Sequence, residues 1–220
     1  MERPRDVYLA ACETIAQNFV GIGFRYSRSA PRLRRKYGDI SHTIEFASSH
    51  YNIAGLHVVL HAYAWVQSAQ ISEWRRATAS PRVQRKFLAG GMVHLLTTDL
   101  GMIEWELAGP ADREEAVSDA ANFLREVVVP YLDRFRSPEA VLEVIAQGGA
   151  PQFDLASMAE YALSAGRKEL AQAVLDRALS DNPKLVAMVE EAERVGIHHP
   201  AGPSTLAEQI VDLRRAHQLR

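Results

Sequence analysis

The apolar positions at the start of the chain recur at the spacing of a helix. Between residues 5 and 20 they follow one another every three to four residues and are Val7, Tyr8, Ala11, Ile15 and Phe19. This period places them on one face of an amphipathic helix, with polar residues between them. Gly21 and Gly23 come next, and glycine relieves the backbone at a helix C-terminus. We therefore expect a first helix over about 5–20.

From Phe24 to Gln67 the period changes to two, which is typical of strands. The predicted strands cover 24–28, 33–37, 40–48 and 56–67, with turns at Pro31, Gly38-Asp39, Asn52 and Gly55. Because consecutive strands are joined by short turns, this segment predicts an antiparallel meander rather than a parallel sheet.

The strand over 56–67 is apolar on both faces. Val58, Leu60, Ala62, Ala64 and Val66 alternate with His57, Val59, His61, Tyr63 and Trp65. Such a strand is central in its sheet and covered on both sides. Segments 92–97 and 103–107 are candidate strands that extend the sheet, and 71–79 predicts a short helix.

The second half of the chain predicts helices. A long helix over 112–135 should bend or break at Pro130, and a shorter helix covers 139–147. Gly148-Gly149-Ala150-Pro151 predicts a linker. Beyond it we expect a helical hairpin and two further helices, over 154–164, 168–180, about 184–195 and 205–219, the last begun by a capping box of Thr205 and Glu208.

The predicted hairpin resembles one tetratricopeptide unit. Ala171, Leu175, Ala178 and Pro183 stand at the usual offsets of that repeat, but no second copy follows. Because repeat units need neighbours to bury their faces, we expect a helical pair docked on a domain. The predicted fold class is α+β: an antiparallel β-sheet flanked by helices over 1–147, then an all-helical extension over 148–220.

Composition fits a globular protein in the cytoplasm. Of the 220 residues, 47% are hydrophobic and 24% are charged, which is enough apolar material for a sizeable core. No apolar run has the length of a membrane span, and charged residues occupy the place of an export signal, so we expect no membrane association. The single cysteine, Cys12, excludes an internal disulfide and is expected to be buried and inert.

Charge is divided unevenly along the chain. Residues 1–90 hold 13 Lys and Arg against 6 Asp and Glu, whereas residues 91–220 hold 12 against 21. A basic surface on the first half could face an acidic protein, nucleic acid or the acidic half of the same chain.

The sequence contains no catalytic motif that we can identify. Gly21 and Gly23 lack the third glycine of a dinucleotide-binding loop, and no nucleophile elbow occurs. His57 and His61 could share a metal ion on a helix, but on a strand they lie ~13 Å apart. Glu45 opposite His57 or His61 could form an acid/base pair, but a cross-strand salt link or a solvated charge is the favoured interpretation. We expect no catalytic residues, no metal and no cofactor.

Basic and aromatic residues of the first half form the candidate binding set. A sheet that bears arginines and aromatic rings can hold phosphates and stacked bases, although edge strands also carry such charges against aggregation. Tyr26 and Tyr37 are interleaved with the basic run. The candidate binding residues are Arg25, Arg28, Arg34, Arg35, Lys36, Tyr51, Trp74, Arg75 and Arg76.

The order of short motifs over about residues 7–145 resembles the bacterial domain of unknown function 4304 family. The motifs are Gly23-Phe24-Arg25, the strand over 40–48, Tyr51-Asn52, Gly90-Gly91, Glu104-Trp105-Glu106-Leu107 and Val129-Pro130-Tyr131-Leu132-Asp133. The resemblance implies a helix-flanked antiparallel sheet and brings no catalytic residues. Small bacterial domains of this kind are often associated with immunity or defence systems.

Three functions remain as alternatives. The first is a non-catalytic interaction protein, of an immunity or defence type, that binds a protein partner. The second is nucleic-acid binding through the basic hairpin, and the third is an enzyme whose site is assembled only in three dimensions. Association with a second copy of the chain stays open.

Overall fold

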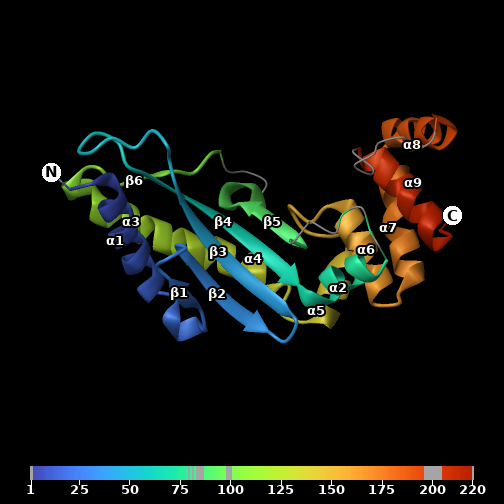
Figure 1. The fold of residues 1–220 in the computed structure, drawn as a ribbon, viewed down its shortest axis with the longest axis horizontal. Helices are drawn as coiled ribbons and strands as arrows, with labels where there is room; N and C mark the ends of the chain where they lie inside the picture. The colour runs from blue at the N-terminus through green and yellow to red at the C-terminus, as the bar shows by residue number, and fades with distance from the viewer. Residues whose placement is uncertain are drawn as a thin grey trace. The chain divides into compact units, whose positions relative to one another are not determined.

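The computed structural model describes residues 2–78, 80, 82, 87–97, 101–195 and 205–219. By its contacts the chain divides into two compact units (Figure 1). Unit 1 comprises Met1–Gln67 and Gly90–Ser137, and unit 2 comprises Ser68–Ala89 and Pro138–Arg220. The division differs from the boundary predicted after residue 147, since it falls at Ser137 and adds residues 68–89 to the helical unit.

Unit 1 is built on an antiparallel sheet, so the predicted α+β fold class is confirmed. The strands follow the order β1-β2-β3-β4-β5, and β6 pairs with β4. Three of the predicted strands lie close to their expected positions, and the strand over 40–48 matches its prediction at both ends. The strands are β1 (Arg25–Ser27), β2 (Arg32–Tyr37), β3 (Ile40–Ser48), β4 (Val59–Ser68), β5 (Ala89–Met92) and β6 (Trp105–Glu106).

Helices cover one face of this sheet. In Figure 1, α3 (Pro110–Phe123) and α4 (Val129–Asp133) lie behind the strands, and α1 (Pro4–Gln17) packs against α3. The helix predicted over 112–135 corresponds to α3 and α4, which are separated by a π-helical turn, Leu124–Val128. This turn ends at Val128, two residues before Pro130, whose ring cannot be placed in an uninterrupted helix without loss of a backbone hydrogen bond.

The two faces of β4 differ in burial. Leu60, Ala62, Ala64 and Val66 point into the core and are at most 2% exposed. Of the alternating residues, Val59 is buried, whereas His61, Tyr63, Trp65 and Gln67 are only half-buried. β4 lies between β3 and β5, as predicted for a central strand, and its second face is covered less completely than the first.

The strand predicted over 92–97 lies earlier in the chain than expected. The observed strand is β5, which ends at Met92, and Val93–Leu96 then form a 3-10 turn. Gly90 explains where the strand forms, because its φ of +116° is a conformation that L side chains rarely adopt. A Cβ at this position would stand 2.0 Å from the main-chain oxygen of Ala64, so only glycine lets β5 approach β4 this closely.

Unit 2 is helical. Its helices are α2 (Ala69–Ala77), α5 (Pro138–Ala146), α6 (Leu155–Ser164), α7 (Lys168–Asp181), α8 (Pro183–Val195) and α9 (Leu206–His217). The predicted hairpin is formed by α6 and α7, and the capping box of Thr205 and Glu208 begins α9 as predicted. The glycines of the predicted linker instead form the turn between α5 and α6, with φ of +106° at Gly148 and +98° at Gly149.

A buried charge cluster joins α2 to α6 inside unit 2. The guanidinium of Arg75 is fully buried and donates to Glu160 at 2.6 and 2.9 Å. Arg82 also donates to Glu160, at 3.1 Å, and to Asp154, at 2.8 Å. Burial lowers the pKa of Arg75, and the Glu160 carboxylate opposes this shift.

Candidate anion-binding site

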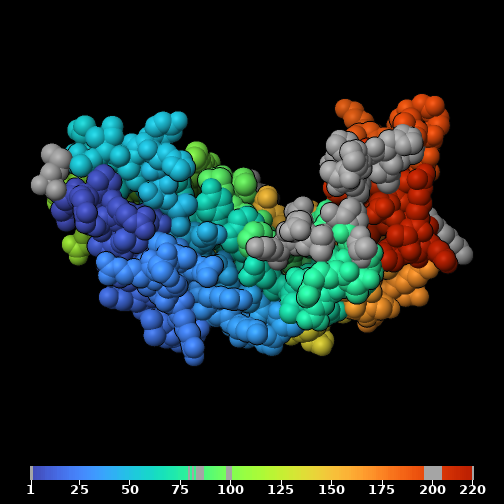
Figure 2. Space-filling view, viewed as in Figure 1, coloured from blue at the N-terminus to red at the C-terminus, as the bar shows by residue number. Residues whose placement is uncertain are grey.

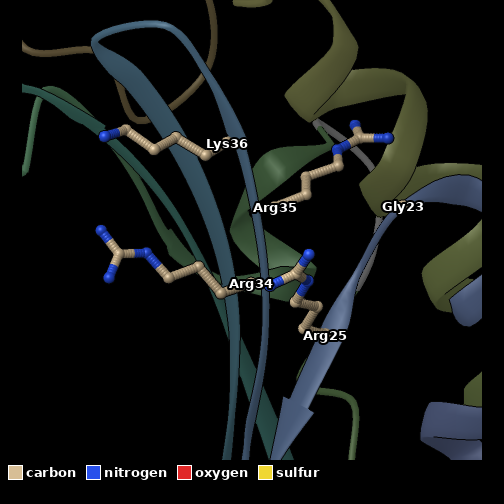
Figure 3. Close-up of a pocket in the computed structure, with 5 residues that line it drawn as sticks. All are labelled: Gly23, Arg25, Arg34, Arg35 and Lys36. Atoms are coloured by element: carbon tan, nitrogen blue, oxygen red, sulfur yellow. The ribbon is translucent and has the colours of Figure 1, made fainter.

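Alternation along β2 separates its side chains onto two faces. Leu33 and Arg35 are buried on the face that the helices cover, whereas Arg32, Arg34 and Lys36 are exposed on the other. Figure 3 shows Arg34 and Lys36 extending to one side of the strand and Arg35 to the opposite side. The pleat of a strand requires this arrangement, because successive side chains point to opposite faces.

We call the side that carries these cations the basic sheet face. It consists of the exposed Arg25, Arg32, Arg34, Lys36 and Glu45, the half-buried Tyr63, Trp65 and Gln67, and the buried Ser41 and Thr43. In Figure 2 the segments of β2 and β3 form part of the surface turned toward the viewer. The strand register assigns the members on β1, β2 and β3: Arg25 lies opposite Arg34, Lys36 opposite Ser41, and Arg32 opposite Glu45.

The strand pairing brings like charges together. Arg25 and Arg34 are direct cross-strand partners, an arrangement that destabilises a sheet when no anion lies between the two charges. Within the described parts of the chain, no carboxylate forms an ion pair with Arg25, Arg34 or Lys36. The guanidinium of Arg34 instead reaches the Ser41 hydroxyl at 3.4 Å. These three cations are therefore free to meet an external anion.

A pocket of about 540 Å³ lies among these cations, where β1 begins. It is lined by Gly23, Arg25, Arg34, Arg35 and Lys36 (Figure 3). Gly23 has a φ of +88°, which turns the chain from the preceding 3-10 turn into β1. Because β1 pairs with β2 only as far as Arg34, the last residues of β2 have no strand beside them on this edge. The basic pocket occupies that position.

Arg35 differs from its neighbours because it is buried. Its Nε donates to His42 Nδ1 at 3.2 Å, its Nη2 pairs with Asp133, and its guanidinium lies 4.5 Å from the ring centroid of Phe24. The ion pair with Asp133 holds β2 against the C-terminal end of α4. Arg35 therefore fixes the strand that carries the pocket, and its charge is already compensated.

His42 completes this buried cluster. Since Nδ1 accepts from Arg35, the ring proton lies on Nε2, which donates to the Phe135 carbonyl at 3.0 Å. Burial lowers the pKa of His42 to about 4, and the Arg35 charge acts in the same direction, while the Phe135 carbonyl opposes it. The imidazole is therefore neutral at physiological pH.

Two aromatic rings share the basic sheet face. The Ser41 hydroxyl donates to Gln67 at 3.4 Å, which places Gln67, and with it the alternating Trp65 and Tyr63 of β4, on the same side as Lys36. The rings of Tyr63 and Trp65 are stacked, with centroids 6.0 Å apart and an interplanar angle of 6°. Sequence reasoning missed them as binding residues, although it placed both on one face of their strand.

The remaining candidate residues do not join this site. Arg28 pairs with Glu13 at 2.9 Å, and Tyr51 is 82% exposed in the loop between β3 and β4. Trp74, Arg75 and Arg76 lie on α2 of unit 2, where Arg75 is buried in the charge cluster and Trp74 packs on His217.

Of the aromatic residues interleaved with the basic run, Tyr26 and Tyr37 lie on the helix-covered side. Tyr26 is the cross-strand partner of Leu33, and Tyr37 alternates with Lys36.

Glu45 lies opposite Arg32, the cross-strand arrangement of opposite charges that was the favoured alternative to an acid/base pair with a histidine. Instead, His57 Nδ1 lies 2.6 Å from Glu106, and His61 Nδ1 lies 3.7 Å from Glu104. Burial alone would raise the pKa of Glu106, but hydrogen bonds from the Val58 and Ala108 amides and from His57 lower it.

Metal and thiol chemistry gain no support from the described part of the chain. It contains no group of three His, Cys, Asp or Glu side chains with a metal-binding arrangement. Cys12 is buried in α1, and burial raises the pKa of its thiol to about 12. None of the described helices is both long enough and apolar enough to span a bilayer.

Comparisons with protein families, curated proteins and solved structures found no match to this chain. The resemblance to the domain of unknown function 4304 family therefore stays a prediction.

Proposed function

We propose that this protein binds nucleic acid through the basic sheet face, with backbone phosphates at Arg25, Arg34 and Lys36. The observation that carries the proposal is the cross-strand pair of Arg25 and Arg34 beside Lys36, which has no carboxylate partner in the described structure. A phosphate in the pocket would relieve the repulsion that this arrangement builds into the sheet.

The charge of the rest of the chain limits the strength of such binding. The net charge is −2 and the sequence pI is about 6.5, so no general attraction to nucleic acid is expected outside the basic face. Glu45 lies on the same face and opposes Arg32, which restricts the anion to the end of the sheet that carries the pocket. We infer a local contact with few phosphates and a strong dependence on salt.

The test is fluorescence anisotropy with a labelled oligonucleotide at low salt. The triple variant Arg25→Ala, Arg34→Ala, Lys36→Ala should lose most of the affinity. Arg35 is excluded from this set because it is buried and its loss would disturb Asp133 and His42. The matched control removes the same number of charges from exposed positions of unit 2, with Arg167→Ala, Lys168→Ala and Lys184→Ala. Equal loss in both variants would contradict a specific role for the pocket.

A second candidate function is binding of a protein partner through the loop between β3 and β4. Three apolar side chains are exposed there: Tyr51 by 82%, Ile53 by 55% and Leu56 by 75%. The loop is fixed, since Ile53 and His57 exchange backbone hydrogen bonds of 2.7 and 2.9 Å and Asn52 accepts from the Val59 amide at 3.0 Å. Exposed apolar clusters of this kind mark interaction surfaces.

The loop hypothesis predicts a partner that depends on these three residues and not on the basic pocket. The variant Tyr51→Ser, Ile53→Ser, Leu56→Ser should lose a stoichiometric partner that the triple pocket variant retains in a pull-down from the native host. Capture of the same protein by the loop variant would contradict this role. Immunity or defence function stays a prediction.

A further inference from the structure

We propose that unit 2 binds a free α-amino acid with an aliphatic side chain, such as L-leucine, in a pocket between α5, α6 and α7. The aliphatic group fills the pocket, the carboxylate pairs with Arg177, and the ammonium group pairs with Asp181. All residues of this pocket belong to unit 2, so the inference is independent of nucleic-acid binding by the basic sheet face. It follows from the apolar walls of the pocket and from two opposite charges beside them.

We call this cavity the α7 pocket. It has a volume of about 150 Å³, and its apolar walls are formed by Ile145 of α5, Leu155 and Met158 of α6, and Val174 and Ala178 of α7. The three helices pack on one another, and Ile145, Met158 and Val174 are buried. An apolar cavity of this volume holds a group about the size of benzene. The isobutyl group of leucine therefore fits, whereas the indole ring of tryptophan is too large.

The glycine turn between α5 and α6 places Arg177 at this pocket. Gly148 lines the pocket, and a Cβ on it would stand 2.7 Å from Nη1 of Arg177. The guanidinium thus lies directly over the turn, in space that the missing side chain leaves open. A Cβ on Gly149 would likewise stand 2.7 Å from Sδ of Met158, which forms part of the wall. The pair of glycines therefore shapes one side of the pocket as well as the turn.

Arg177 and Asp181 present opposite charges on one face of α7. They are four residues apart, so their side chains leave the helix on the same side, and both are exposed where they line the pocket. Neither forms an ion pair within the described part of the chain, and Arg177 donates one long hydrogen bond, of 3.4 Å, to the Ala146 carbonyl. A guanidinium binds a carboxylate through two parallel hydrogen bonds, and an ammonium group donates to a carboxylate. Both side chains are therefore available to a ligand that carries both charges.

A free amino acid matches this arrangement better than the end of a peptide does. Its carboxylate and ammonium group are attached to one carbon beside the side chain, so both charges meet a partner while the aliphatic group enters the pocket. The last residue of a peptide offers only a carboxylate and the first residue only an ammonium group. Each would leave one charge at the pocket without a partner, and this difference in affinity provides the selectivity.

The test is a titration of the isotopically labelled full chain, in which the backbone amide NMR signals of Gly148 and Gly149 report on the pocket. L-Leucine should shift these signals with a dissociation constant on the order of 1 mM or tighter. Glycine, L-leucinamide, N-acetyl-L-leucine and L-tryptophan should each bind about tenfold or more weakly. The first lacks the side chain, the next two lack one charge each, and the last does not fit the cavity.

Two variants assign the two charges. Arg177→Gln should weaken the binding of L-leucine by about tenfold or more without weakening that of L-leucinamide, which has no carboxylate. Asp181→Asn should weaken L-leucine by a similar factor without weakening N-acetyl-L-leucine, which has no ammonium group. Arg167→Gln and Asp176→Asn make the same changes at exposed positions outside the pocket and should bind L-leucine like wild type. Since all four side chains are exposed, each variant should fold, which circular dichroism checks.

Three results would overturn the inference. The first is the absence of any shift at Gly148 and Gly149 when L-leucine is present at about ten times the expected dissociation constant, where a site is nearly saturated. The second is equal affinity for L-leucine and N-acetyl-L-leucine or L-leucinamide, because the pocket would then recognise a peptide end. The third is an equal effect of Arg177→Gln and its control Arg167→Gln. None of these results alters the test of the basic sheet face, which uses different residues and an oligonucleotide.

Discussion

Mild acid should destabilise unit 1 because His42 must stay neutral in the fold. Its Nδ1 accepts from Arg35 and its Nε2 donates to Phe135, so an added proton would place two donors face to face beside a guanidinium. The other charged groups that act on the ring are Asp133, which favours protonation, and Arg136, which opposes it. Burial is the largest effect, and the pKa of His42 falls from 6.5 to about 4.

The direction of the pH effect follows from this difference. Between pH 6.5 and pH 4 the unfolded chain binds a proton at His42 and the folded chain does not, so the free energy of unfolding falls as pH is lowered through this window. A shift of this size corresponds to roughly 3 kcal/mol in full and about 2 kcal/mol between pH 8 and pH 5. Below about pH 4, where His42 is protonated in the folded chain as well, its contribution to the free energy of unfolding no longer changes with pH.

The assay is urea unfolding at pH 8 and pH 5, followed by tryptophan fluorescence. In a Trp74→Phe background the reporters are Trp65 and Trp105, which both belong to unit 1. His42→Gln supplies an amide oxygen for Arg35 and an amide N–H for Phe135 but cannot titrate. Its loss of stability between the two pH values should be smaller than that of the parent by about 2 kcal/mol. Equal losses in the two proteins would refute the reasoning.

Three further predictions concern stability and reactivity. Glu160→Ala leaves the buried Arg75 without its carboxylate and should destabilise unit 2 by about 3–5 kcal/mol in urea unfolding; a loss below 1 kcal/mol would contradict the buried pair. Gly90→Ala should cost about 1–3 kcal/mol from steric strain, whereas Gly21→Ala, where a Cβ meets nothing within 4 Å, should cost much less. Cys12 should react with a thiol reagent at pH 7 only at the rate of unfolding, since burial raises its pKa to about 12; rapid labelling of the native protein would contradict this.

Local pattern predicted much of the fold because the local rules agree with the final packing. The alternation over 40–48 gives β3, and the capping residues Thr205 and Glu208 begin α9. The failures occur where a distant contact decides the structure. Position 90 forms a strand because a glycine there fits against Ala64, which no local propensity indicates.

The sequence predicted which charged residues belong to the candidate site, but not which side chains each of them contacts. Arg25, Arg34 and Lys36 were expected from their density in the sequence, and they line one pocket. Arg75 is also an arginine of the basic first half, but it is buried. Its charge is neutralised by Glu160, which is distant in the sequence. Likewise, Tyr63 and Trp65 of β4 lie on the basic sheet face only through the order of the strands, which a single sequence does not specify.

The most direct test of the central claim is the salt dependence with which a labelled single-stranded oligonucleotide binds to wild type and to the variant Arg25→Ala, Arg34→Ala, Lys36→Ala. Each phosphate contact contributes about 0.7 to the slope of log affinity against log salt concentration, so three contacts contribute roughly 2. We predict that the variant slope is flatter than the wild-type slope by this amount, while the unit 2 control variant keeps the wild-type slope. Identical slopes for wild type and the pocket variant would show that these cations do not bind phosphate.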